Sequence, residues 1–159
     1  MRKLKLYLET SAWNFYFADD APEKRDVTIG FFKMLSKGEY EIYASDIVFL
    51  EINRAEKYIR EKLEGLIQKN HPFMLESSSE SRQLAETYLK RGIIPAHKIE
   101  DALHVAIATV AELDALVTWN YRHLANLRKA EYFHSINLEQ GFFKRLEIIT
   151  PLEVTSDEI

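Results

Sequence analysis

The sequence predicts an α/β protein built on a parallel sheet, and two observations carry this prediction. Short segments with strand character alternate along the chain with longer segments whose apolar residues recur at helical spacing. The segment 115–119 is an apolar, β-branched run, which is typical of a strand buried in a parallel sheet. Because strands joined by helices form right-handed βαβ units, the strands are expected to run parallel.

The first half of the chain contains two predicted strands and three predicted helices. Both strands are short and β-prone, and each is followed by hydroxyl or acidic residues that favour a helix start. The helices carry apolar residues at helical spacing, and Gly38 ends the first of them. In order, the elements are a strand over 4–9, a helix over 23–36, a strand over 41–44, a helix that begins at Ser45 and Asp46 and carries Glu51, and a helix over 56–69.

The second half continues the alternation. The helix that begins at Pro95 is apolar on most of its faces and is therefore predicted to be buried. In order, the elements are a strand over 73–75, a helix over 80–91, a helix from Pro95 to Leu113, a strand over 115–119 and a strand over 147–150. No element is assigned between 120 and 147.

Composition limits the kind of protein and of site. A chain of 159 residues with 47% hydrophobic residues is expected to fold as a single domain over 1–159. The absence of cysteine excludes disulfides and thiolate metal sites, so a bound metal would need oxygen or histidine ligands. No apolar block suits a signal peptide or a membrane span, so a cytoplasmic protein without membrane contact is expected.

The net charge of -4 weighs against nucleic-acid binding by bulk electrostatics. The objection weakens where carboxylates surround a divalent metal, because the ion then supplies the positive charge that meets a phosphate.

Polar residues follow three of the predicted strands, where open parallel sheets bind their ligands. They are Glu9, Thr10 and Ser11 after the first strand, Ser45 and Asp46 after the second, and Thr118 and Asn120 after the strand over 115–119.

Three acids are candidates for a site, and each also has a structural explanation. Glu9 and Asp101 stand near predicted helix starts, where the helix dipole stabilises a negative charge. Glu51 lies in a largely apolar helix segment and could pair with a nearby Arg54 or Lys57. Asp101 has apolar neighbours and stands three residues before His104, a spacing that is a weak metal motif by itself.

Four segments together resemble the PIN domain family, in family order and across nearly the whole chain. The segments are Leu6-Tyr7-Leu8-Glu9-Thr10-Ser11, Ser45-Asp46-Ile47-Val48-Phe49-Leu50-Glu51-Ile52, Asp101-Ala102-Leu103-His104-Val105-Ala106-Ile107-Ala108 and Leu116-Val117-Thr118-Trp119-Asn120-Tyr121-Arg122-His123-Leu124. Thr150-Pro151-Leu152-Glu153 is also similar to the closing strand of the family. The resemblance implies a three-layer α/β/α sandwich around a parallel sheet of four or five strands.

The resemblance also implies a metal-dependent ribonuclease that holds Mg²⁺ or Mn²⁺ with clustered carboxylates. Carried over by position, Glu9, Glu51 and Asp101 are the metal ligands, and Asn120 takes the fourth catalytic place. Supporting roles fall to Thr10, Ser11, Thr118 and His104. The basic residues Arg122, His123, Arg128 and Lys129 either meet RNA phosphates or belong to a solvated helix face. A VapC-type toxin of this family would have RNA as substrate, an antitoxin protein as partner and a homodimer as its assembly.

Two positions depart from the family pattern. Glu9 stands where Asp is commoner, and Asn120 replaces an Asp, so one charge is lost and a second ion should bind more weakly. This substitution favours a second hypothesis, a catalytically weak or inactive PIN-like module that binds RNA or protein. A third hypothesis is a domain that binds a small phosphorylated ligand, but the sequence has no glycine-rich phosphate loop.

The aromatic segment from Trp13 to Phe17 serves either a dimer interface or the core.

Overall fold

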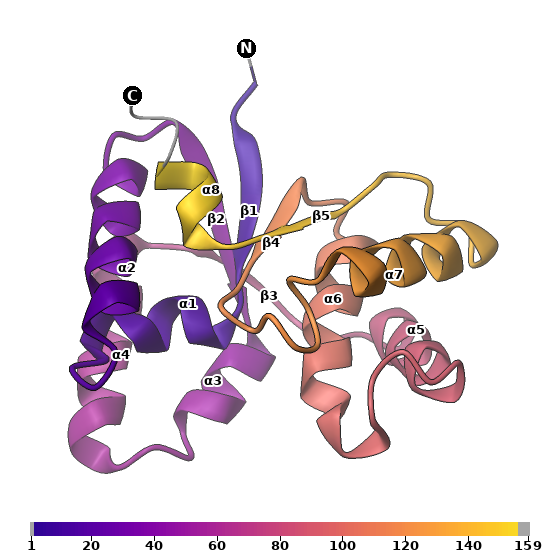
Figure 1. Ribbon diagram of the computed structural model, residues 1–159, viewed down its shortest axis with the longest axis horizontal. Coiled ribbons are helices and arrows are strands. Elements are labelled where there is room, and N and C mark those ends of the chain that lie inside the picture. The colour runs from indigo at the N-terminus through magenta and orange to yellow at the C-terminus, as the bar shows by residue number, and fades with distance from the viewer. Residues whose placement is uncertain (1, 156–159) are drawn as a thin grey trace.

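The computed structural model describes residues 2–155 and contains one five-stranded parallel sheet (Figure 1). The strands are β1 (Leu4–Leu8), β2 (Tyr40–Ser45), β3 (Phe73–Leu75), β4 (Ala115–Val117) and β5 (Glu147–Ile149). They stand in the order β3-β2-β1-β4-β5, with Leu6 of β1 in register with Ile42 of β2 and Ala115 of β4. The predicted parallel sheet is confirmed, with five strands.

Helices cover both faces of this sheet (Figure 1). On one side lie α1 (Thr10–Asn14), α2 (Pro22–Leu35) and α4 (Lys57–Asn70), and on the other lie α5 (Ser79–Lys90), α6 (Ile99–Val110) and α7 (Leu127–Glu139). The remaining helical elements are α3 (Asp46–Ile52), α8 (Pro151–Thr155) and the short 3-10 helices η1 (Phe15–Phe17) and η2 (Ala96–Lys98). The result is the three-layer α/β/α sandwich that the sequence predicted.

The core lies between the central strands and the helices that cover them. Leu8 and Leu116, on neighbouring strands, are fully buried, as is Val105 on α6. Burial of such a side chain stabilises the fold by about 1.5–3 kcal/mol. Seven of the twelve residues of α6 are buried and none of the other five is exposed, which confirms that this helix is enclosed on most sides. None of the helices within residues 2–155 has the length and apolar character needed to cross a bilayer.

The predicted last strand over 147–150 is confirmed as β5, but the segment Thr150–Glu153, which resembled the closing strand of the family, is not a strand. The strand ends at Ile149, and Pro151 begins helix α8. The Thr150 amide donates to Glu153 Oε2 over 2.8 Å, while Leu152 N donates to Thr150 Oγ1 over 3.2 Å. These reciprocal bonds, with proline at the first helical position, favour a helix start over a strand.

The strand order creates a switch point beside β1. From β1 the chain proceeds outward through β2 and β3, and it then returns to the other side of β1 with β4. The connections after β1 and β4 therefore diverge at this point, where open parallel sheets bind ligands. Glu9 follows β1 directly, and its amide donates to the Val117 carbonyl at the end of β4 over 3.1 Å.

Candidate active site

The Glu9 carboxylate is buried at the switch point and accepts hydrogen bonds from two neighbouring segments. Thr118 Oγ1 donates to Glu9 Oε1 over 2.6 Å, and Ser11 Oγ donates to the same oxygen over 2.5 Å. Ser11 N donates to Oε2 over 3.1 Å, so Glu9 also caps α1. Glu9 is therefore a helix-entry acid, and its carboxylate also faces the ends of β1 and β4.

The Glu51 carboxylate is held by two residues from other elements. Thr10 Oγ1 donates to Glu51 Oε1 over 2.8 Å, and His104 Nε2 makes a very short contact with the same oxygen. The salt bridge with Arg54 or Lys57 that the sequence allowed is not formed: Arg54 pairs with Glu100 and Lys57 with Glu61. Glu51 is therefore turned toward the switch point.

His104 is fully buried and continues this network into the core. Its Nδ1 lies 2.6 Å from the Tyr7 hydroxyl, which lies 2.7 Å from Ser45 Oγ. Burial raises the pKa of Tyr7 well above its usual value, so the phenol stays protonated. Both ring nitrogens of His104 thus have protein partners, and the ring positions Glu51.

The charges of Glu51 and His104 stabilise each other. Burial raises the pKa of Glu51, but the hydrogen bond with His104 and the imidazolium charge outweigh it, so the pKa is lowered. For His104, burial lowers the pKa, and the hydrogen bond with Glu51 and the charge of Glu9 outweigh it, so the pKa is raised. Both shifts favour a carboxylate beside an imidazolium near neutral pH.

Asp101 is half-buried in the first turn of α6 and lies beside Asn120. Asn120 Nδ2 donates to Asp101 Oδ2 over 3.3 Å, and Asn120 Oδ1 accepts from His123 N over 3.0 Å. The second bond fixes the amide orientation, because a flipped amide would turn an N–H toward the His123 N–H. Asn120 therefore presents a donor to Asp101, where an aspartate would add a further negative charge.

The three acids affect one another electrostatically. The pKa of Asp101 is raised to about 6, first by burial and then by the negative charges of Glu9 and, more weakly, Glu51. Oxygens of Glu9 and Glu51 and a ring nitrogen of His104 lie within 4.8 Å of one another.

The structure brings together eight of the residues that the sequence singled out: Glu9, Thr10, Ser11, Glu51, Asp101, His104, Thr118 and Asn120. Asp46, although it also follows a strand, accepts instead from Ser77.

A group of basic residues lies next to Asn120. We call this group the basic rim; its members are His97, Lys98, Arg122, His123 and Lys129. Burial lowers the pKa of His123, and so do the positive charges of Arg122, Lys129, Lys98 and His97. Lys98 also lowers the pKa of Asp101, so the rim reaches the acids. Sequence reasoning named Arg122, His123 and Lys129 but missed Lys98, which immediately precedes α6.

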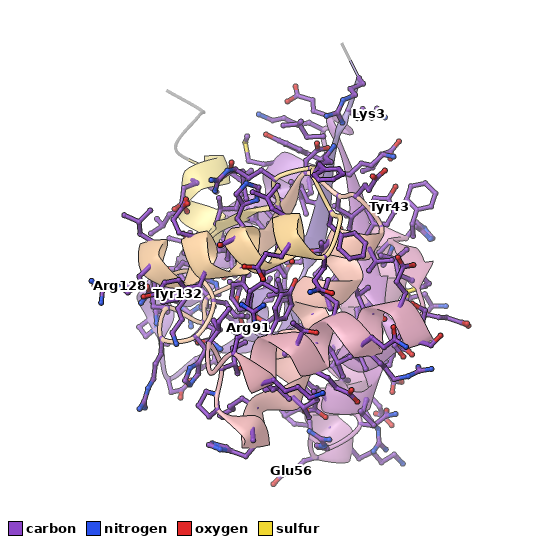
Figure 2. The ribbon with its side chains drawn as sticks, turned by 90° about the vertical axis from the view of Figure 1, so that its right-hand side faces the viewer. Lys3, Tyr43, Glu56, Arg91, Arg128 and Tyr132 are labelled. Carbon is purple, nitrogen blue, oxygen red and sulfur yellow. The ribbon has the colours of Figure 1, made fainter. Side chains whose placement is uncertain are left out.

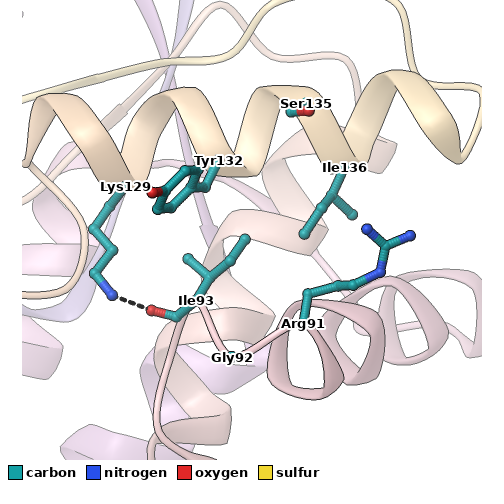
Figure 3. A pocket seen from close by; sticks show the side chains of 7 residues that line it. All are labelled: Arg91, Gly92, Ile93, Lys129, Tyr132, Ser135 and Ile136. Carbon is teal, nitrogen blue, oxygen red and sulfur yellow. Dashed lines mark hydrogen bonds between the residues drawn. The ribbon is translucent and has the colours of Figure 1, made fainter.

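The two basic residues at the start of α7 have different surroundings. Arg128 projects into solvent (Figure 2). The Lys129 ammonium donates to the Ile93 carbonyl at the edge of a pocket of about 250 Å³ between α7 and the segment after α5 (Figure 3). No candidate acid lines this pocket.

The aromatic segment that follows the first acid packs within the chain. Trp13 is fully buried and lies against Phe32, while Tyr16 contacts both Phe17 and Phe32. Trp13 therefore belongs to the core, and Tyr16 and Phe17 are partly buried and pack against it.

Comparison with known proteins identifies the fold. No family model and no curated protein sequence matches the chain. Among solved structures, the chain is similar to VapC20 from Mycobacterium tuberculosis, a sarcin–ricin loop cleaving toxin, with a TM-score of 0.58 and 13% identity over 74% of this chain and 92% of that one. It is also similar to VapBC2 from Rickettsia felis bound to a promoter DNA fragment, with a TM-score of 0.55 and 15% identity over 91% of this chain and 98% of that one. The chain thus has the fold of these VapC-type structures, the PIN fold that its sequence motifs resemble.

Proposed function

We propose that this chain is a divalent-metal-dependent endoribonuclease of the PIN type. The observation that carries the proposal is the convergence of three acids at the switch point of the sheet. Ligand oxygens of Glu9 and Glu51 lie within 4.8 Å of each other, and Asp101 is joined to Glu9 through hydrogen bonds of Asn120 and Thr118. Burial raises the pKa of Asp101, and the negative charges of Glu9 and Glu51 add to the cost of ionising it. A bound cation would remove the cost, so the arrangement fits a metal site.

The donor set suits Mg²⁺ or Mn²⁺, which prefer oxygen ligands. Glu9, Glu51 and Asp101 would hold the ion, with hydroxyl groups of Thr10, Ser11 and Thr118 fixing two of the carboxylates. When bound, such an ion lowers the pKa of a coordinated water and stabilises charge on a phosphoryl oxygen. His104 holds Glu51 in orientation.

RNA fits the charges around these acids. The basic rim offers cations to backbone phosphates on one side of Asp101, although the whole chain carries a net charge of -4. VapC20, which has the same fold, is a toxin that cleaves an RNA loop. We extend the proposal to a toxin that acts on RNA and is neutralised by an antitoxin, as the VapBC2 pair suggests.

Cleavage of a mixed RNA pool tests the proposal. Wild-type protein should produce fragments with Mn²⁺ or Mg²⁺ and none with EDTA. Asp101→Asn and Glu51→Gln should each lower the rate roughly 100-fold or more, because each removes a charge from the proposed site. Asp46→Asn is the matched control, since Asp46 shares α3 with Glu51 but bonds to Ser77, and it should keep the wild-type rate.

Equal rates for wild type and Asp101→Asn would show that the activity comes from another site or a contaminant. Activity that persists in EDTA would contradict the metal requirement.

A second candidate function is an inactive PIN-like module that binds RNA or protein. The neutral Asn120, whose amide already donates to Asp101, favours it. If wild-type protein binds RNA but yields no fragments with either metal, while Asn120→Asp does, the inactive module is the correct assignment.

A further inference from the structure

Three aromatic rings surround one lysine beside the candidate active site. The Lys24 ammonium of α2 lies 5.3 Å from the ring centre of Phe15, 5.7 Å from Trp119 and 5.4 Å from Tyr121. Trp119 is buried, and its indole N–H donates to Thr28 Oγ1 over 2.9 Å, which fixes the ring. The Phe15 and Tyr121 rings lie 6.0 Å and 6.3 Å from it. We call Phe15, Lys24, Trp119 and Tyr121 the aromatic cluster.

The aromatic cluster is continuous with the acids. Trp119 and Tyr121 flank Asn120, which donates to Asp101, and the Trp119 amide donates to Ser11 Oγ over 2.8 Å. Ser11 Oγ in turn donates to Glu9. Tyr121, the next residue after Asn120, is 46% exposed.

The lysine in this cluster is available to an anion. The nearby acids Asp19 and Asp26 both pair with Arg25, at 3.1 Å and 3.2 Å, and Lys24 forms no ion pair with a carboxylate within residues 2–155. Contact with ring faces leaves the ammonium protons that point away from the rings free to bind a phosphate oxygen.

We propose that the aromatic cluster is a nucleotide subsite that holds one base and one phosphate of single-stranded RNA beside the cleavage site. The base stacks on the exposed Tyr121 ring, which makes an edge contact with the fixed Trp119 ring, and Lys24 binds the adjoining phosphate. The subsite rests on the proposed RNA substrate. Arg122 and His123 of the basic rim follow Tyr121 directly in the chain, so RNA bound at the acids would contact both the aromatic cluster and the basic rim.

Binding titrations in EDTA separate base stacking from charge. The two probes are a labelled ten-nucleotide oligouridylate and a chain of ten abasic ribose phosphates. Wild-type protein should bind the oligouridylate about tenfold more tightly than the abasic chain, the scale expected for one stacked base. Tyr121→Ala should lose this preference, and Tyr121→Leu, which keeps an apolar contact with Trp119 but has no ring, should lose it as well. Tyr121→Phe should retain it.

Lys24→Gln should weaken binding of both probes equally and reduce the slope of log affinity against log salt by about 0.7, as for the loss of one phosphate contact with a single strand. The matched controls come from a similar lysine–aromatic contact on α4, where Lys62 lies 4.4 Å from the Tyr58 ring centre and Tyr58 is 63% exposed. Tyr58→Ala and Lys62→Gln should bind both probes as the wild type does.

The subsite is overturned if Tyr121→Ala and Tyr121→Leu keep the wild-type preference for the oligouridylate, or if Tyr58→Ala loses it to the same degree. This result is independent of the ribonuclease proposal, because no metal is present and no cleavage is measured. Loss of RNA cleavage in Asp101→Asn together with an unchanged probe preference in Tyr121→Ala would leave the nuclease intact and remove the subsite alone.

Discussion

At the scale of single residues, the candidate site consists of polar side chains whose partners lie far away in sequence. Tyr7 and His104 are 97 positions apart, and Glu9 and Thr118 are 109 apart. The sequence indicated Glu9 and His104 through motif resemblance. It could not indicate the role of Tyr7, because a tyrosine in an alternating strand has the pattern of any core residue.

Asp114 is a paired carboxylate whose contribution to stability should depend strongly on pH. Its oxygens accept from Arg2 over 2.8 Å, from the Lys5 amide over 2.8 Å and from Lys144 over 2.9 Å, and its side chain is 13% exposed. The hydrogen bond from Arg2, the largest cause, holds the pKa of Asp114 well below its usual value. A depressed pKa contributes stability above the unfolded-state value of about 3.9, and this contribution is lost as pH falls toward the folded-state value.

We therefore predict that Asp114→Asn lowers the free energy of unfolding by about 1–2 kcal/mol at pH 7. The difference from wild type should shrink steadily below about pH 4, as urea denaturation at a series of pH values would measure. Asp26→Asn is the control, since Asp26 is exposed and its ion pair should contribute less than about 0.5 kcal/mol. If the difference in free energy of unfolding between wild type and Asp114→Asn stayed constant from pH 7 to pH 2, this explanation would be ruled out.

At the scale of elements, the strands and most helices could be predicted from local patterns, and α7 could not. Its buried residues are Phe133, Ile136 and Asn137, so a polar side chain interrupts the apolar stripe. Leu127 and Tyr132 are exposed on the same helix, which blurs the periodicity further. The segment 120–147 therefore offered no clear helical pattern, although Asn126 caps the helix by accepting from two backbone amides.

Asn137 is predicted to anchor α7 to the rest of the helical layer. The Tyr88 hydroxyl of α5 donates to its Oδ1, and its Nδ2 donates to Thr109 Oγ1 of α6 over 3.3 Å. Asn137→Ala leaves these buried groups unpaired and should lower the free energy of unfolding by about 2–3 kcal/mol. Ser135→Ala, at an exposed position on the same helix, should change it by less than about 0.5 kcal/mol. Chemical denaturation measures both, and equal effects of the two substitutions would refute the anchor.

At the scale of the whole molecule, the strand order brings the acids together. Local patterns predicted a parallel sheet but not the order β3-β2-β1-β4-β5, which puts the ends of β1 and β4 side by side. Local patterns therefore offered the three acids only as separate candidates, and the resemblance alone grouped them into one set. Lys24 of the aromatic cluster remained hidden, because only the folded chain brings it next to Trp119. Lys98 of the basic rim stands three residues before Asp101, and this spacing could have indicated it.

Calorimetric titration with Mn²⁺ tests the central claim, that Glu9, Glu51 and Asp101 form one metal site. Wild-type protein should bind Mn²⁺, and Glu9→Gln, Glu51→Gln and Asp101→Asn should each weaken binding at least about tenfold. Asp46→Asn should bind as the wild type does, because its carboxylate bonds to Ser77 outside the site. Mn²⁺ binding that is absent from the wild type, or unchanged in all three site variants, would contradict the account.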